Sequence, residues 1–193
     1  MTEQSFSLIP FPAFPVPNIS IGGEISLRNN IVDLHYVLAG RLQDVLFPST
    51  SMNPHRNDEL WKLTCFEFFL AAQEQPQYWE FNMSPSGDWN IYHMDDYRRV
   101  GFREEASFSR LPFEIRKEAH VLHVNALVDL DPILQPGQLL EFGIAAIIQS
   151  TDGTETYWAL THPASFADFH LRESFILRLA GQAHHLQQPA RGD

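Results

Sequence analysis

Apolar and polar residues alternate at every second position along most of the chain, and this pattern is typical of β-strands. In the segment 120–128, for example, Leu122, Val124, Ala126 and Val128 fall on one face. Neighbouring side chains of a strand point to opposite faces of a sheet, so each such segment has one apolar face and one face with isolated polar groups. The strands expected from the pattern are 5–11, 19–27, 31–38, 63–70, 78–84, 89–92, 107–115, 120–128, 139–148, 154–160 and 174–179.

Prolines and glycines separate these segments at regular intervals. Residues 84–88 (Ser-Pro-Ser-Gly-Asp) and 151–153 (Thr-Asp-Gly) are turn sequences that favour hairpins. Three prolines in 11–17 predict an extended edge segment, and the polar stretch 41–59 predicts a long loop with one helical turn. Many short strands with turns between them predict an all-β fold, a β-sandwich of jelly-roll or immunoglobulin-like build with about ten or more mostly antiparallel strands.

The composition agrees with one packed domain. The chain has 193 residues, of which 44% are hydrophobic and 19% charged, a balance that supports a core and argues against general disorder. We find no stretch that resembles an interdomain linker. We therefore expect a single ligand-binding domain over residues 1–181, followed by a flexible polar tail over 182–193.

Net charge and cysteine content exclude several classes of function. The formal net charge is −11, which repels nucleic-acid phosphates and anionic membrane surfaces. Cys65 is the single cysteine, so neither an internal disulfide nor a CxxC metal site is expected. The N-terminus shows no signal peptide and no window reaches transmembrane length, so we expect a cytoplasmic protein.

Isolated polar residues in the apolar strands are the first candidates for a site. Glu67, Asn82 and Asn125 each lie opposite an apolar set in their strand. One interpretation is a sheet face exposed to water, and the other is a polar, partly enclosed face that holds a ligand. Glu67 is surrounded by phenylalanines, so a carboxylate buried there needs a hydrogen-bonding or cationic partner. The candidate partners are Arg98, Arg99, His123 and a ligand hydroxyl.

Two clusters of aromatic and polar residues supply further candidates. Residues 89–103 interleave aromatics, arginines and aspartates, including Trp89, Tyr97 and Arg98. Residues 157–170 carry Trp158, His162 and His170. Aromatic faces beside hydrogen-bonding groups are what a sugar ring needs, so the first cluster fits a sugar, although it also fits an ordinary aromatic hairpin with a solvated acidic turn. In the second cluster Ser165, His170 and Asp168 could be assembled into a catalytic triad, but no nucleophile elbow supports it, and a structural histidine that caps a loop is the simpler interpretation. The spacing of the histidines matches no known metal site, so no metal is expected.

Three stretches resemble the DOMON-like domains, which are related to family-nine carbohydrate-binding modules. They are 60–70 (LWKLTCFEFFL), 78–89 (YWEFNMSPSGDW) running on to Tyr97-Arg98, and 158–163 with 168–170 and 175–179. The resemblance implies a β-sandwich that binds a sugar or haem. In sugar-binding members aromatic side chains clamp the sugar, and Trp89 and Trp158 are the positions to which this role is transferred.

The expected function is non-catalytic binding of a small molecule, most simply a saccharide, without a cofactor. One alternative is a redox-linked domain that binds haem b through Met83 or Met94 together with His162 or His170. Another is a glycoside hydrolase that uses Glu67, Glu80 or Glu141 as paired carboxyl groups. A protein-interaction module is the fourth possibility.

Overall fold

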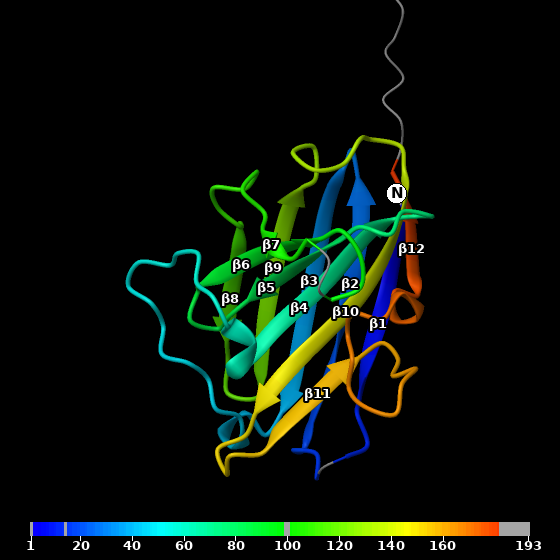
Figure 1. The fold of residues 1–193 in the computed structure, drawn as a ribbon. Coiled ribbons are helices and arrows are strands. Elements are labelled where there is room, and N and C mark those ends of the chain that lie inside the picture. Colours follow the sequence, from blue (N-terminus) through cyan, green and yellow to red (C-terminus); the bar gives the residue numbers. More distant parts are fainter. Residues whose placement is uncertain (1, 14, 99–100, 182–193) are drawn as a thin grey trace, which may run out of the picture.

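The computed structural model describes residues 2–13, 15–98 and 101–181, and it is built from β-strands stacked in two layers (Figure 1). Twelve antiparallel strands lie in the described residues, and no α-helix occurs among them. The hydrogen-bonded order is β7-β6-β5-β4-β10-β11-β1-β2-β3-β9-β8, with β12 paired to β10. This confirms the expected all-β, antiparallel architecture.

The front layer in Figure 1 carries the site described below. Its strands are β4 (Cys65–Ala72), β5 (Tyr78–Met83), β6 (Trp89–Met94), β7 (Arg103–Glu104), β10 (Leu139–Gln149), β11 (Glu155–Ala159) and β12 (Leu177–Ala180). The back layer contains β2 (Ile19–Arg28), β3 (Ile31–Gly40), β8 (Phe113–Lys117) and β9 (Val121–Asp129). Three short 3-10 helices connect strands: η1 (Leu42–Asp44), η2 (Leu60–Lys62) and η3 (Arg172–Ser174).

The strand β1 (Thr2–Pro10) joins the two layers. Its residues 2–8 pair with β2 in the back layer, whereas Ile9 and Pro10 pair with β11 in the front layer. A strand that passes from one sheet to the other closes one side of a sandwich, so the whole set curls into a half-barrel.

The core lies between the layers and is made by one face of each. In β4, Phe66, Phe68 and Leu70 point inward, and Phe68 stacks on Phe81 of β5 at 4.2 Å between ring centroids. Tyr36 of β3 crosses this core and donates a hydrogen bond to the backbone carbonyl of Glu67 at 2.6 Å. Because every second side chain of β4 points into the core, Cys65, Glu67 and Phe69 lie on the outer face of the layer. This is the face on which the ligand was expected to bind.

The expected strands 107–115 and 174–179 are shorter in the structure. Residues 107–112 are irregular, because Pro112 has no N–H for a ladder and Phe108 and Leu111 turn into the core. Ser174 ends a 3-10 helix, residues 175–176 are irregular, and the strand begins only at Leu177. The short β7 was not expected.

Two further expectations concern the ends and surface of the molecule. The predicted flexible tail, 182–193, lies outside the described residues. No helix within 2–13, 15–98 and 101–181 is long and apolar enough to cross a membrane.

Candidate ligand-binding cleft

The outer face of the front layer collects the polar side chains of several strands. Register places Glu67 of β4 directly between Ala145 of β10 and Asn82 of β5, and Asn82 is followed by Asn90 of β6. The small side chain of Ala145 leaves space beside Glu67, whereas the asparagines extend the polar row across the sheet. The expectation that polar strand residues gather on one face is therefore met for this layer.

Glu67 and Glu80 form the floor of a cleft on this face. Glu67 is only 2% exposed, and its Oε1 accepts no hydrogen bond from the described residues. Glu80 Oε1 accepts a hydrogen bond of 2.8 Å from Asn82 Nδ2. Burial raises the pKa of both carboxyl groups, with the charge of Glu80 adding to the rise at Glu67, and the pKa of Glu80 reaches about 7.

Aromatic side chains form two opposite walls above this floor. On one side, Trp61 of η2 and Phe102 both pack on Tyr92 of β6, with centroid distances of 5.7 and 4.9 Å. On the other side, Tyr157 of β11 lies 6.2 Å from Phe169. Each wall therefore contains two rings that line the cleft, Trp61 and Phe102 on one side and Tyr157 and Phe169 on the other.

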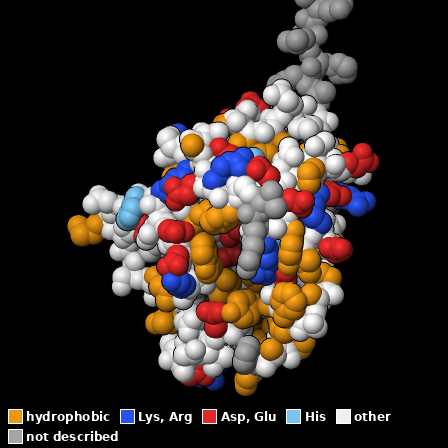
Figure 2. All heavy atoms as spheres, viewed as in Figure 1, with side chains coloured by type: hydrophobic (Ala, Val, Ile, Leu, Met, Phe, Trp, Pro, Cys, Tyr) orange, Lys and Arg blue, Asp and Glu red, His pale blue; other side chains and the backbone are white. Residues whose placement is uncertain are grey.

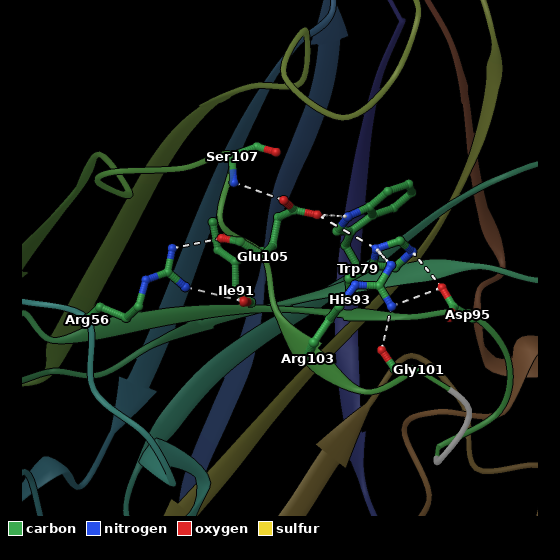
Figure 3. Close-up of polar contacts among 9 residues, drawn as sticks. All are labelled: Arg56, Trp79, Ile91, His93, Asp95, Gly101, Arg103, Glu105 and Ser107. Atoms are coloured by element: carbon green, nitrogen blue, oxygen red, sulfur yellow. Dashed lines mark hydrogen bonds and ion pairs between the residues drawn. The ribbon is translucent and has the colours of Figure 1, made fainter.

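The loop that carries Phe102 is held by one arginine (Figure 3). Arg103 donates to the carbonyl of Gly101 at 2.6 Å, to Asp95 Oδ1 at 3.1 Å and to His93 Nδ1 at 2.8 Å. The imidazole of His93 in turn stacks on Trp79 at 4.8 Å. A planar guanidinium with several donors fixes a loop in this way, so the half-exposed Phe102 has a defined position.

The segment that leads to Trp61 is held by Arg56. Its guanidinium stacks on Trp89 at 4.4 Å and donates to Asn90 Oδ1 at 2.6 Å. It also reaches the backbone carbonyls of Glu105 and Phe108 at 2.9 and 2.8 Å. Arg56 thus ties the loop before η2 to β6 and to the loop after β7.

Asp168 connects two loops at the rim of the cleft. Its carboxylate pairs with Arg98 at 2.7 Å and accepts hydrogen bonds from the Tyr97 hydroxyl and from the backbone N–H of His170. Burial opposes ionisation of Asp168, but the bonds from Arg98, Tyr97 and His170 outweigh it and lower the pKa. Asp168 is therefore an anion at neutral pH, and its charge cancels that of Arg98.

His170 is a neutral residue of the cleft. The hydroxyl oxygen of Tyr78 accepts a hydrogen bond of 3.1 Å from the backbone N–H of Arg98. The hydroxyl hydrogen of Tyr78 is therefore available for donation to His170 Nδ1 at 2.9 Å. This assignment places the ring hydrogen on Nε2, which lies 3.9 Å from Glu80 Oε2. Burial and, to a smaller extent, the nearby charge of Arg98 lower the pKa of His170 to about 4.

The resulting cleft has a volume of about 410 Å³, which is the size of a small-molecule site. Figure 2 shows it as a hollow on the visible face, with acidic side chains at the bottom between hydrophobic ones. Its lining residues are Trp61, Glu67, Glu80, Arg98, Phe102, Ile147, Tyr157, Ala167, Phe169 and His170.

Three of the residues expected in a site line this cleft, namely Glu67, Arg98 and His170. Asn82 adjoins it through its bond to Glu80. Tyr97, which is 44% exposed, lies at the rim and contacts Asp168 rather than the floor.

The other expected site residues lie elsewhere. Trp89 and Trp158 are buried in the core between the layers, because each shares the inward phase of its strand, and a ligand on the outer face does not reach them. Asn125 lies on β9 in the back layer, in a separate depression with Glu24, Asp33 and His35. His162 is half-buried and bonds the backbone carbonyl of Ile9 at 2.9 Å.

The residues named for haem do not come together at one cavity. Met83 is buried in the core, and Met94 is fully buried in a second cluster beside Tyr78. Neither methionine lines the cleft that contains His170. Within the described part of the chain, no three His, Cys, Asp or Glu side chains form a group that could hold a metal ion.

Sequence reasoning missed most of the walls. Trp61, Phe102 and Phe169 lie outside regular strands, so no periodicity assigns them to a face. Glu80 is different, since alternation places it on the face of Asn82 and the sequence already named it as a candidate carboxyl group of the hydrolase alternative.

Comparison with known proteins identifies the fold. No protein-family model and no curated protein matches the sequence. A candidate carbohydrate-binding protein from Bacteroides uniformis superposes with a TM-score of 0.71 and 12% identity, over 93% of this chain and 85% of that chain. A family 9 carbohydrate binding module from Caldicellulosiruptor kristjanssonii superposes in its glucose complex with a TM-score of 0.54 and 11% identity, over 90% and 83%. Its cellotriose complex gives 0.58 and 12%, over 98% and 88%. The expected similarity to family-nine modules is thus confirmed at the level of the fold.

Proposed function

We propose that this protein binds a saccharide in the cleft formed by Trp61, Tyr157 and the floor residues Glu67 and Glu80. The observation that carries the proposal is the pair of aromatic walls above a polar floor. Sugar rings present C–H faces that stack on aromatic rings and hydroxyl groups that pair with carboxylates and amides. Loops on both sides are fixed by arginines, so the site is preorganised and loses little entropy on binding.

Structural relatives support the same class of ligand. The module from Caldicellulosiruptor kristjanssonii is described in complex with glucose and with cellotriose, and the Bacteroides uniformis protein is described as a candidate for carbohydrate binding. We therefore choose glucose, cellobiose and cellotriose as the first neutral ligands for this chain.

Isothermal titration calorimetry with these sugars tests the proposal. We expect saturable binding to the wild-type protein and its loss in Trp61→Ala, because this substitution removes one wall. Asn125→Ala is the control. Because Asn125 lies in the back layer, this variant should bind the sugars as the wild type does. Equal binding by Trp61→Ala and the wild type, or no binding of any sugar, would reject the proposed site.

Glycoside hydrolysis is a second candidate, favoured by two carboxyl groups with raised pKa in one cleft. Hydrolysis needs the two carboxyl groups on opposite sides of the scissile bond. Here both rise from neighbouring strands of one floor, which favours binding over hydrolysis. Release of reducing sugar from a glycoside panel, abolished by Glu80→Gln, would establish the enzyme instead.

A further inference from the structure

The floor of the cleft has an excess of hydrogen-bond acceptors. Glu67 and Glu80 together supply four carboxyl oxygens, of which Glu80 Oε1 is bonded to Asn82 and Glu67 Oε1 has no donor among the described residues. The nearest ring N–H, on His170, lies 3.9 Å from Glu80 Oε2, which is too long for a hydrogen bond. A ligand that fits this floor must therefore bring donors.

The floor also lacks a positive charge of its own. Two titratable groups lie beside Glu67, namely Cys65 and Tyr36. The titratable and charged groups around Glu80 are Tyr78, Tyr92, Arg98, Asp168 and His170. Arg98 is the cation of this set, and it is paired with the buried Asp168 at 2.7 Å. The charge of Arg98 lowers the pKa of Glu80 but its guanidinium is bonded to Asp168, and His170 is neutral, so no cation among the described residues is bonded to either carboxyl group.

An ammonium group complements this floor better than a hydroxyl group does. It brings three donors and a positive charge, whereas each sugar hydroxyl brings one donor and no charge. Aromatic rings at the walls add to this preference, because a cation within about 6 Å of a ring centroid is attracted by the ring. The charge also offsets the cost of keeping two carboxylates buried.

We propose that the saccharide bound in this cleft is an amino sugar, and that its protonated amine is held by Glu67 and Glu80. This inference rests on the proposed function, and it names the class of saccharide that the site selects. Arg98 does not contact the amine, because it remains paired with Asp168. The sugar ring lies between the walls formed by Trp61 and Tyr157.

Binding of the amine has a consequence for protons. Because burial raises the pKa of Glu80 to about 7, the empty floor still holds protons at pH 7. A cation stabilises the ionised carboxyl groups and expels those protons. A neutral sugar gives no such release.

Matched sugars that differ at one ring position test the inference at pH 7. We choose glucose, glucosamine and N-acetylglucosamine, together with cellobiose and the corresponding β-1,4-linked glucosamine disaccharide. We expect each amino sugar to bind at least about 10-fold more tightly than its neutral partner, which corresponds to about 1.4 kcal/mol. Calorimetry in two buffers of different ionisation enthalpy should show proton release with glucosamine and its disaccharide, and none with the three neutral sugars.

Glu67→Gln and Glu80→Gln are the informative variants, because they keep the shape of the floor and remove its charge. We expect both variants to lose the preference for the amine, so that glucosamine binds no more tightly than glucose, with melting temperatures that verify folding. Tighter binding of glucosamine by the wild type, lost in these variants, supports the inference. Binding of glucose in the cleft with equal or higher affinity than glucosamine overturns it and leaves the proposed function standing. No binding of any sugar rejects both.

Discussion

The guanidinium of Arg98 lies 2.7 Å from the carboxylate of Asp168, and this ion pair joins the loop after β6 to the loop after β11. The two loops carry Phe102 and Phe169, which stand on opposite walls of the cleft. The separation of the walls therefore depends on one buried carboxylate.

Asp168→Asn should weaken this connection. The amide retains the shape but not the charge, so we expect a loss of about 1–3 kcal/mol in the free energy of unfolding at pH 7 and weaker saccharide binding. The folded-state pKa of Asp168 is lowered, so its stabilising contribution is present above the unfolded pKa of about 3.9 and is lost as pH falls through the folded value. Urea denaturation at pH 7 and pH 3 measures the difference between wild type and variant, which should shrink at pH 3. The exposed Asp33→Asn serves as the control, and a difference that stays constant with pH contradicts the assignment.

Glu67→Gln should stabilise the protein at alkaline pH. Burial raises the pKa of Glu67 and Glu80 in the folded state, and the pKa of Glu80 reaches about 7. The neutral carboxyl groups therefore contribute their full stability below the unfolded pKa of about 4.3. This contribution is lost as pH rises through the folded-state pKa values. We expect the variant to be more stable than the wild type at pH 8, with little difference at pH 4. Thermal denaturation across this range measures the effect. The account fails here if the variant is less stable than the wild type at pH 8.

Trp61 and Trp158 should separate binding from stability. Trp61 is half-buried at the rim, so Trp61→Ala is expected to abolish saccharide binding at a cost of about 1–2 kcal/mol in stability. Trp158 is buried in the core, so Trp158→Ala is expected to cost about 3–5 kcal/mol. Calorimetric titration and urea denaturation of both variants provide the two readouts. If a folded Trp158→Phe variant lost saccharide binding while Trp61→Ala retained it, Trp158 rather than Trp61 would be the tryptophan that contacts the ligand.

Arg56→Lys should destabilise the loop before η2 although it keeps the charge. A lysine ammonium does not reproduce the stack on Trp89 together with the bonds to Asn90 and two backbone carbonyls. We expect a loss of about 1–3 kcal/mol in stability, and faster hydrogen exchange in residues 56–62. The exposed Arg116→Lys is the matched control and should change neither quantity. Unchanged exchange in 56–62 would show that another contact fixes this loop.

The fold was predictable because its signals are local. Alternation in 63–70, 78–84, 120–128 and 139–148 assigned β4, β5, β9 and β10, and the turn at 84–88 assigned one hairpin. The prediction was wrong for 107–112, whereas 113–115 form the first part of β8. Pro112 removes a ladder hydrogen bond, and Phe108 contributes to the core from an irregular segment.

The site was predictable only where it lies on strands. Alternation placed Glu67 and Asn82 on one face, and register in the structure brings them side by side. It did not exclude Asn125, because the pattern of one strand does not reveal which layer the strand joins. Trp89 and Trp158 were assigned to a clamp from a family resemblance, but the phase of their strands turns them inward.

A crystal structure of the protein grown with the tightest-binding saccharide of the panel tests the central claim most directly. The account predicts density for a sugar ring between Trp61 and Tyr157, with a ligand donor within about 3 Å of a carboxyl oxygen of Glu67 or Glu80. Density confined to the depression beside Asn125, or to the groove between Phe47 and Phe113, would contradict it.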